Sequence, residues 1–281
     1  SAMFIRKFFV KMQVVGWFFP YFFAAIGCGP AVRMQVLVPA DLSVPTHIQT
    51  VAVVDRSRAK NVGQAVLGVL EGALTGEEIG ADTNGRSEAL GAVRTLLTES
   101  PRFDVVTPNI DQKGLDSSLF DKQMSWDTAK RICKQVGCEG IVALEAFDSD
   151  TSVDIDVDEY TEEKNGKKVT RKSYTAERWL KVLTAWRLYD VSNGGVVDDK
   201  RDLSFDTSWS STGDTEDAAR QGLEAQSHYI SQMGRRSGEA YAARIAPVYT
   251  WVMRRLYKSG SDKMKVAAKL TRSDQWDKAT A

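Results

Sequence analysis

Carboxylates dominate the segment that follows Phe147. The run contains Asp148, Asp150, Asp154, Asp156, Asp158 and Glu159, and several carboxylate oxygens close together are the ligands that calcium prefers. An EF-hand loop, however, needs glycine at its sixth position and glutamate at its twelfth, whereas the sixth position counted from Asp148 is Val153. Acidic residues alternate here with apolar ones, which favours a β-strand with one solvated face.

One enzymatic interpretation of this acidic ribbon stays open, that of a metal-dependent envelope hydrolase. No pair of acids stands out at the separation that a glycosidase needs, so we name no catalytic residue and no metal ligand. His47 and His228 are the only histidines, and neither lies in a His-x-x-x-His or Cys-x-x-Cys motif. The sequence therefore offers few residues for a metal site or a Ser-His-Asp triad, and no cofactor is expected.

Two other patterns point to binding but have a plainer interpretation. Residues 61–76 are rich in glycine, but no Gly-Lys-Ser or Gly-Lys-Thr follows, so their apolar spacing predicts a loose helix and not a nucleotide site. Four tryptophans on predicted strands could line a sugar or peptide groove, namely Trp179, Trp186, Trp209 and Trp251. Aromatic residues on strands more often pack against their neighbours, and we expect these four in the core.

Cys28 is the residue with the clearest predicted covalent chemistry. It follows Ala25, Ile26 and Gly27 at the end of an apolar stretch, and basic residues precede that stretch. Pro20 interrupts the apolar part, which is shorter than the roughly 20 residues of a membrane-spanning helix. This is the pattern of an export signal whose cysteine becomes the lipidated N-terminus of a bacterial lipoprotein.

These signals divide the chain into four parts. We predict a lipoprotein signal peptide at 1–28, a tether at 29–46, an α/β domain with antiparallel ribbons at 47–258, and at 259–281 the start of a helical repeat region that continues beyond Ala281. The chain is formally neutral, so no basic surplus argues for a nucleic-acid partner. Only two cysteines follow Cys28, and packing must therefore supply the stability of the core.

The order of the predicted elements defines the fold class. Strands are predicted over residues 48–54, 103–107 and 139–147, and helices over 86–98 and 125–136. This alternation predicts an α/β fold on a small, mostly parallel sheet. After Asp148 the pattern changes to long strands over 151–160, 168–189 and 196–208. The expected sheet is therefore mixed, with a parallel βαβ core that antiparallel hairpins extend.

The hairpin turn at Asn165-Gly166 sets a specific register. Asn-Gly suits the two left-handed positions of a type I′ turn. The pairs Lys164 with Lys167, Glu163 with Lys168, and Glu159 with Lys172 then lie opposite each other. An acidic strand faces a basic one, and the opposite charges help to fix the register.

The C-terminal part is predicted to be mainly helical. A long helix over 214–242 contains Gly222, Gly234 and Gly238, which allow close packing. Residues 248–256 alternate, which favours a strand and leaves a helix as the alternative. Two further helices, over 263–270 and from residue 274 onward, are similar to the first half of a tetratricopeptide repeat.

Cys133 and Cys138 are predicted to lie in contact. If Gly137 ends the preceding helix in the left-handed conformation, a Schellman ending brings positions C3 and C″ together, and these positions are the two cysteines. In an oxidising compartment this contact permits a disulfide, but the motif alone does not set the bridge geometry. Both a disulfide and a reduced pair therefore stay open.

Five motifs carry a resemblance to known families, at residues 51–57, 100–106, 143–148, 186–190 and 244–247. They resemble an uncharacterised family of envelope lipoproteins, known mainly from Bacteroidetes, which continue into tetratricopeptide-like helices. More distantly, the order of elements is similar to the anticodon-binding-like domains of the Tol translocation protein, the curli secretion channel and the lipoprotein activators of penicillin-binding proteins. The distant resemblance implies a binding or assembly module without catalysis, and the nearer one assigns no site residues.

The sequence therefore predicts a non-enzymatic protein of the bacterial cell envelope. We expect its lipid anchor to hold it in the outer membrane, where it binds or assembles protein partners in the periplasm. The hydrolase that uses the acidic ribbon is the alternative.

Overall fold

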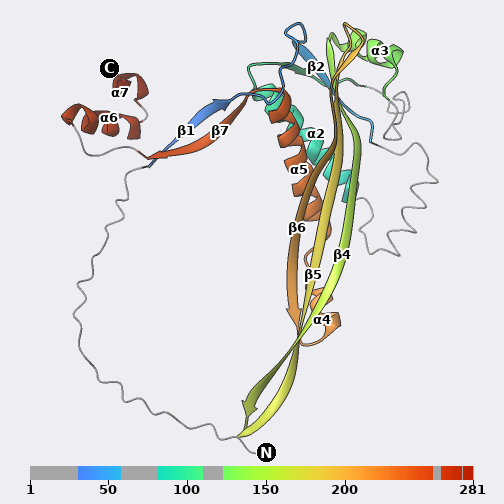
Figure 1. The fold of residues 1–281 in the computed structure, drawn as a ribbon, viewed down its shortest axis with the longest axis vertical. Coiled ribbons are helices and arrows are strands. Elements are labelled where there is room, and N and C mark those ends of the chain that lie inside the picture. Colours follow the sequence, from blue (N-terminus) through green and yellow to red (C-terminus); the bar gives the residue numbers. More distant parts are fainter. Residues whose placement is uncertain (1–30, 58–80, 110–122, 256–260, 274, 281) are drawn as a thin grey trace, which may run out of the picture. The chain divides into compact units, whose positions relative to one another are not determined.

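The computed structural model describes residues 31–57, 81–109, 123–255, 261–273 and 275–280. The chain divides into two compact units, Gln35–Thr250 and the paired segments Ser1–Met34 and Trp251–Ala281. The elements are β1 (Ala31–Val38), β2 (Thr50–Asp55), α2 (Ala81–Glu99), β3 (Asp104–Val106), α3 (Trp126–Val136), β4 (Gly140–Lys164), β5 (Lys167–Asp190), β6 (Gly195–Gly213), α4 (Glu216–Gln221), α5 (Gln226–Ile245), β7 (Val248–Arg255), α6 (Asp262–Arg272) and α7 (Trp276–Thr280) (Figure 1). Among the residues described, no helix has both the length and the apolar character needed to cross a membrane.

Five strands form one mixed sheet in the order β3-β2-β4-β5-β6. β2 runs parallel to β3 and β4, whereas β4, β5 and β6 are antiparallel to their neighbours. The prediction of a mixed sheet with a parallel core and antiparallel extensions is confirmed. Because β2 pairs with β4 only as far as Leu144, the sheet narrows to β4, β5 and β6 beyond that residue.

β4 is one continuous strand, whereas the sequence predicted two separate strands over 139–147 and 151–160. The register shifts between Leu144 and Ala146, which marks a bulge at Glu145. After the bulge, exposed and covered side chains keep alternating through Asp148 and Asp150. The polar residues there mark a solvated face of the strand and not its end.

Helices cover the two faces of the sheet unequally. α2 and α5 pack on one face, over a core that includes Val53, Leu144 and Trp186. The shorter α3 packs on the other face, over Ala52 and Ile141. In Figure 1, α2 and α5 run along the sheet, while α3 lies near the end where β2 joins it. Beyond the part that α3 covers, one face of β4, β5 and β6 is therefore left without a helix among the described elements.

Glycines allow α5 to lie close to α2. A Cβ atom at Gly234 would be 2.2 Å from the carbonyl oxygen of Gly85, and one at Gly238 would be 2.1 Å from that of Ala89. No side chain fits at these separations. The predicted close packing is confirmed for these two glycines.

The predicted single helix over 214–242 is wrong, because α4 ends before Gly222 and α5 begins at Gln226. The Thr215 hydroxyl caps α4 by accepting from the Ala218 amide at 3.1 Å. At Gly222 the chain passes β6 so closely that a Cβ atom would lie 2.1 Å from the Ser211 hydroxyl. This approach to the sheet explains the break.

The strand predicted over 248–256 is confirmed as β7, which pairs with β1 in a separate two-stranded sheet. The helices that follow are short, with 11 residues in α6 and 5 in α7. They do not confirm the tetratricopeptide-like segment.

Candidate functional site

The main candidate surface is the face of β4, β5 and β6 that points away from α2 and α5. Leu180 and Val182 of β5 point into the core, so alternate residues of the three strands point outward. The outward set comprises Asp148, Asp150, Ser152, Asp154, Asp156 and Asp158 of β4, Ser173, Thr175, Glu177, Trp179, Lys181 and Leu183 of β5, and Ser204, Asp206, Ser208, Ser210 and Thr212 of β6. We call this set the acidic face. It holds seven carboxylates, one lysine and many small hydroxyl side chains.

Trp179 is the large aromatic side chain of the acidic face. Its cross-strand neighbours are Ser152 and Ser208, and the indole is 47% exposed. The small cross-strand neighbours leave part of the ring exposed to a ligand.

The four tryptophans that were expected in the core differ in how far they are buried. Trp186 is fully buried and stacks on Tyr241, which confirms the prediction for this residue. Trp209 is partly exposed. The prediction is wrong for Trp179 and for Trp251, which is 53% exposed on β7. Strand alternation fixed the direction of Trp179, but no described helix covers this part of the face to which it points.

The carboxylates of the acidic face are spread along the strands. Same-face neighbours on one strand are about 7 Å apart, which is too far for several of them to bind one ion. In the described ranges, no group of three or more His, Cys, Asp or Glu side chains could hold a metal ion. The interpretation of the run as a solvated strand face is confirmed.

A carboxylate beside the inner end of the acidic run has a perturbed pKa. Asp82, in the first turn of α2, accepts a hydrogen bond from the Ser149 hydroxyl at 2.5 Å. Burial raises the pKa of Asp82, and the nearby charges of Asp148 and Asp150 raise it further, against the opposing effect of Ser149.

The outer end of the ribbon has the predicted register. Lys164 lies opposite Lys167, and Glu159 lies opposite Lys172 with an N–O distance of 3.1 Å. Asn165 and Gly166 have φ values of 56° and 74°, as a type I′ turn requires. The Glu159–Lys172 pair is exposed, so it sets register more than stability.

A second candidate is a buried charged cluster where β2 ends beside β4 and β5. Nη1 of Arg56 lies 2.7 Å from Oε1 of Glu145, and the Tyr189 hydroxyl donates to the same oxygen at 2.5 Å. Arg187 lies 3.8 Å from this carboxylate and 3.1 Å from Asp199. The cluster thus ties the end of β2 to three strands of the sheet.

The chemistry of the cluster favours a structural role. Burial and the adjacent Glu145 charge raise the pKa of Tyr189 to about 12, so its hydroxyl stays protonated and donates to that carboxylate. The same hydroxyl accepts from the Met124 amide at 3.0 Å, which fixes the start of α3. Sequence analysis did not identify this cluster, although Arg56, Glu145 and Arg187 were visible as charges within apolar strand motifs.

Cys133 and Cys138 form a disulfide, with their Cα atoms 4.5 Å apart. Gly137 is left-handed, and the amides of Gly137 and Cys138 donate to the Cys133 carbonyl at 2.8 and 3.2 Å. The predicted helix ending is confirmed, and the bond from Cys138 is the Schellman bond.

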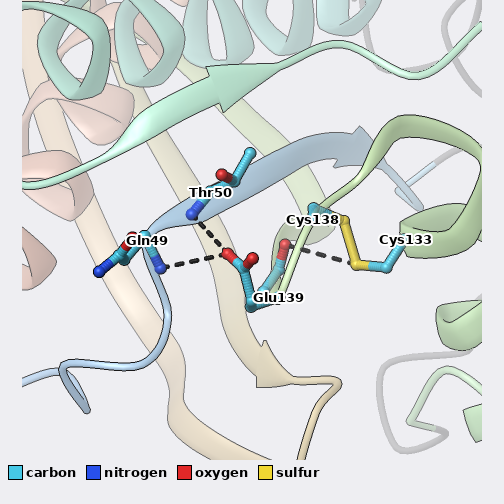
Figure 2. The surroundings of a disulfide bond; sticks show 6 residues. Gln49, Thr50, Cys133, Cys138 and Glu139 are labelled. Carbon is cyan, nitrogen blue, oxygen red and sulfur yellow. Dashed lines mark hydrogen bonds between the residues drawn. A yellow bond between two sulfur atoms is a disulfide. The ribbon is translucent and has the colours of Figure 1, made fainter.

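Figure 2 shows how the next residue uses this ending. Glu139 turns its carboxylate toward β2 and accepts from the amides of Gln49 and Thr50 at 3.2 and 2.7 Å. The disulfide-linked turn therefore helps to position the start of β2.

The two histidines occupy separate places. Nε2 of His47 lies 2.8 Å from Oδ2 of Asp190. Burial alone would raise the pKa of Asp190, but hydrogen bonds from Asn193 and His47 lower it below its usual value. His228 is on α5, where it contacts Gln232. Neither histidine belongs to the acidic face.

Two predicted features fall outside the described residues, namely lipidation of Cys28 and the glycine-rich segment 61–76.

Comparison with known proteins places the chain in a family. No curated protein matches it. Among solved structures, the hypothetical protein CT253 from Chlamydia trachomatis is similar, with 15% identity and a TM-score of 0.29 over 70% of this chain and 95% of that one. Residues 48–257 match the family described as "Domain of unknown function (DUF8603)". Because this match spans most of the sequence, the chain belongs to that family.

Proposed function

We propose that this protein is a lipid-anchored, non-enzymatic binding module of the bacterial cell envelope whose acidic face takes a protein partner. The observation that carries the proposal is the uncovered face of β4, β5 and β6, with seven carboxylates and one lysine. An antiparallel sheet buries its apolar face and can leave the other face in solvent. A long sheet face that stays in solvent is therefore available for a partner.

The chemistry of the face selects the class of partner. Its negative field repels nucleic acids and anionic lipids and attracts basic segments. Trp179 adds an apolar anchor whose ring also attracts a lysine or arginine head group. The proposed partner is thus a protein with a basic, extended or helical segment.

The lipid anchor in this proposal rests on the sequence around Cys28. The small residues before this cysteine and the short apolar stretch are those of a lipoprotein signal. Such an anchor would hold the protein on a membrane of the cell envelope, and we propose that this is the outer membrane. The hydrolase alternative would need carboxylates gathered around one point, and the spread of the acidic face favours binding instead.

Binding through the acidic face can be measured with the full-length chain in non-ionic detergent. The probe is a fluorescent peptide of alternating lysine and valine, and the readout is anisotropy at several salt concentrations. We expect saturable binding that weakens as salt rises. Asp154→Asn combined with Asp156→Asn should weaken it, and Trp179→Ala should weaken it about tenfold, as for a moderate hot spot.

Matched control substitutions lie on the opposite face of the same strand. Glu159→Gln combined with Glu163→Gln removes the same number of charges and should weaken binding less. Equal weakening by the two double variants would show that the peptide senses only net charge and would contradict a defined surface.

The anchor has its own test. Cys28→Ser should abolish incorporation of labelled fatty acid, and the chain should remain uncleaved or be released by a carbonate wash. A cleaved Cys28→Ser chain that stays in the membrane fraction would contradict the lipid anchor.

A further inference from the structure

Most of the large apolar side chains that are exposed belong to elements outside the five-stranded sheet. Seven of the eleven that are exposed in the described structure belong to β1, β7 and α6, namely Leu37, Val38, Tyr249, Trp251, Met253, Met264 and Val266. On β7, Tyr249, Trp251 and Met253 alternate and so share one face. Met253 is 73% exposed, the largest fraction among these seven. A two-stranded sheet is marginal by itself, and this face gains stability from an apolar environment.

The same part of the chain is basic. The guanidinium of Arg33 lies 4.6 Å from the ring centre of Trp251, and Arg254 and Arg255 end β7. Residues 251–281 contain eight lysines or arginines, three aspartates and no glutamate. Aromatic rings with neighbouring basic groups fit the boundary between lipid headgroups and water, where tryptophan and tyrosine are enriched.

Covalent geometry keeps β1 near the proposed anchor. Only Gly29 and Pro30 lie between Cys28 and Ala31, the first residue of β1, and the three residue steps from Cys28 to Ala31 span at most about 10 Å. If Cys28 carries acyl chains, the start of β1 must lie close to the headgroups.

We propose that the β7 face formed by Trp251 and Met253, together with Arg33, lies on the surface of an anionic phospholipid bilayer. The proposal rests on the lipid anchor of the proposed function. Basic side chains are attracted to anionic headgroups, and the aromatic and thioether groups enter the boundary region. The acyl chains hold the protein in the membrane, while this contact fixes its orientation there.

The test uses the full-length lipidated chain in nanodiscs. The discs contain phosphatidylglycerol with brominated acyl chains, which quench nearby tryptophans, and the control discs contain phosphatidylcholine with the same bromination. We expect stronger quenching in the anionic discs. Trp251→Phe should remove most of it, and Trp179→Phe, a matched change on the acidic face, should leave it unchanged. Arg254→Gln with Arg255→Gln should bring quenching down to the level in neutral discs.

Each outcome separates this inference from the function on which it rests. Anchored protein whose quenching is unaffected by Trp251→Phe overturns the surface contact and leaves the anchor standing. Loss of the wild-type chain from the discs after washing contradicts the anchor itself. Equal quenching of Trp251 in neutral and anionic discs overturns the anionic selectivity of the contact.

Discussion

The inner and outer halves of β4 use the same chemical group in opposite ways. Glu145 is 1% exposed and contacts Arg56 and Tyr189, whereas Asp154 and Asp156 point into solvent. Around Glu145 the adjoining strands supply arginines. Opposite Asp154 and Asp156 they supply Glu177 and Thr175, which cannot neutralise a carboxylate. A carboxylate is structural where its own fold provides the counter-charge, and it is left for a partner where the fold does not.

Removing the inner carboxylate should give the largest effect. Glu145→Gln removes the carboxylate charge that lies 2.7 Å from the buried Arg56, and breaking a buried ion pair in this way costs about 3–5 kcal/mol of unfolding free energy. Urea denaturation measures it. Glu163→Gln is the same change on the outer half of the same strand and should alter stability little. A similar loss of unfolding free energy in the two variants would contradict the difference between a structural inner half and a solvent-exposed outer half of β4.

The disulfide before β4 should have the next largest effect. Cys133→Ser opens a short loop, for which the loss of cross-link entropy corresponds to about 2 kcal/mol. Adding a thiol reductant should lower the denaturation midpoint of the wild-type chain to that of the variant. It should leave the midpoint of the variant unchanged. An unchanged wild-type midpoint under reductant would show that the bond contributes nothing to stability.

The Glu159–Lys172 ion pair near the turn between β4 and β5 should contribute still less to stability. Glu159→Gln and Lys172→Met, combined in a double-mutant cycle, should give a coupling energy close to the detection limit because both side chains are largely exposed. A coupling energy as large as the loss of stability from Glu145→Gln would show that solvent does not screen the charges of the outer half.

The pH dependence of Asp82 gives the smallest expected difference. Burial raises its folded-state pKa above 3.8, so the folded chain holds this proton more tightly than the unfolded chain. The contribution to stability is present below pH 3.8 and is lost as pH rises through the folded-state pKa. Asp82→Asn has no carboxylate to ionise, so its melting temperature relative to wild type should increase from acid toward neutral pH. A constant difference across pH would contradict the raised pKa.

The sequence alone determined features that depend on neighbouring residues. The Asn165-Gly166 turn and the pairing of Glu159 with Lys172 follow from backbone preferences and a strand period of two. The helix ending at Gly137 likewise depends on a single residue that can adopt a positive φ. The acidic strand of the candidate site was predicted for the same reason, since alternation is a local pattern.

The tertiary structure decided which faces are covered and which distant groups meet. Trp186 is buried and Trp179 exposed although both lie on β5, because α5 lies over the face to which Trp186 points and no described helix covers the other face around Trp179. Glu177 and Asp206 joined the acidic face only through the pairing of β5 with β4 and β6. Arg56 meets Glu145 across 89 residues of sequence. Burial and charge pairing depend on contacts between distant segments, and no local pattern in the sequence encodes those contacts.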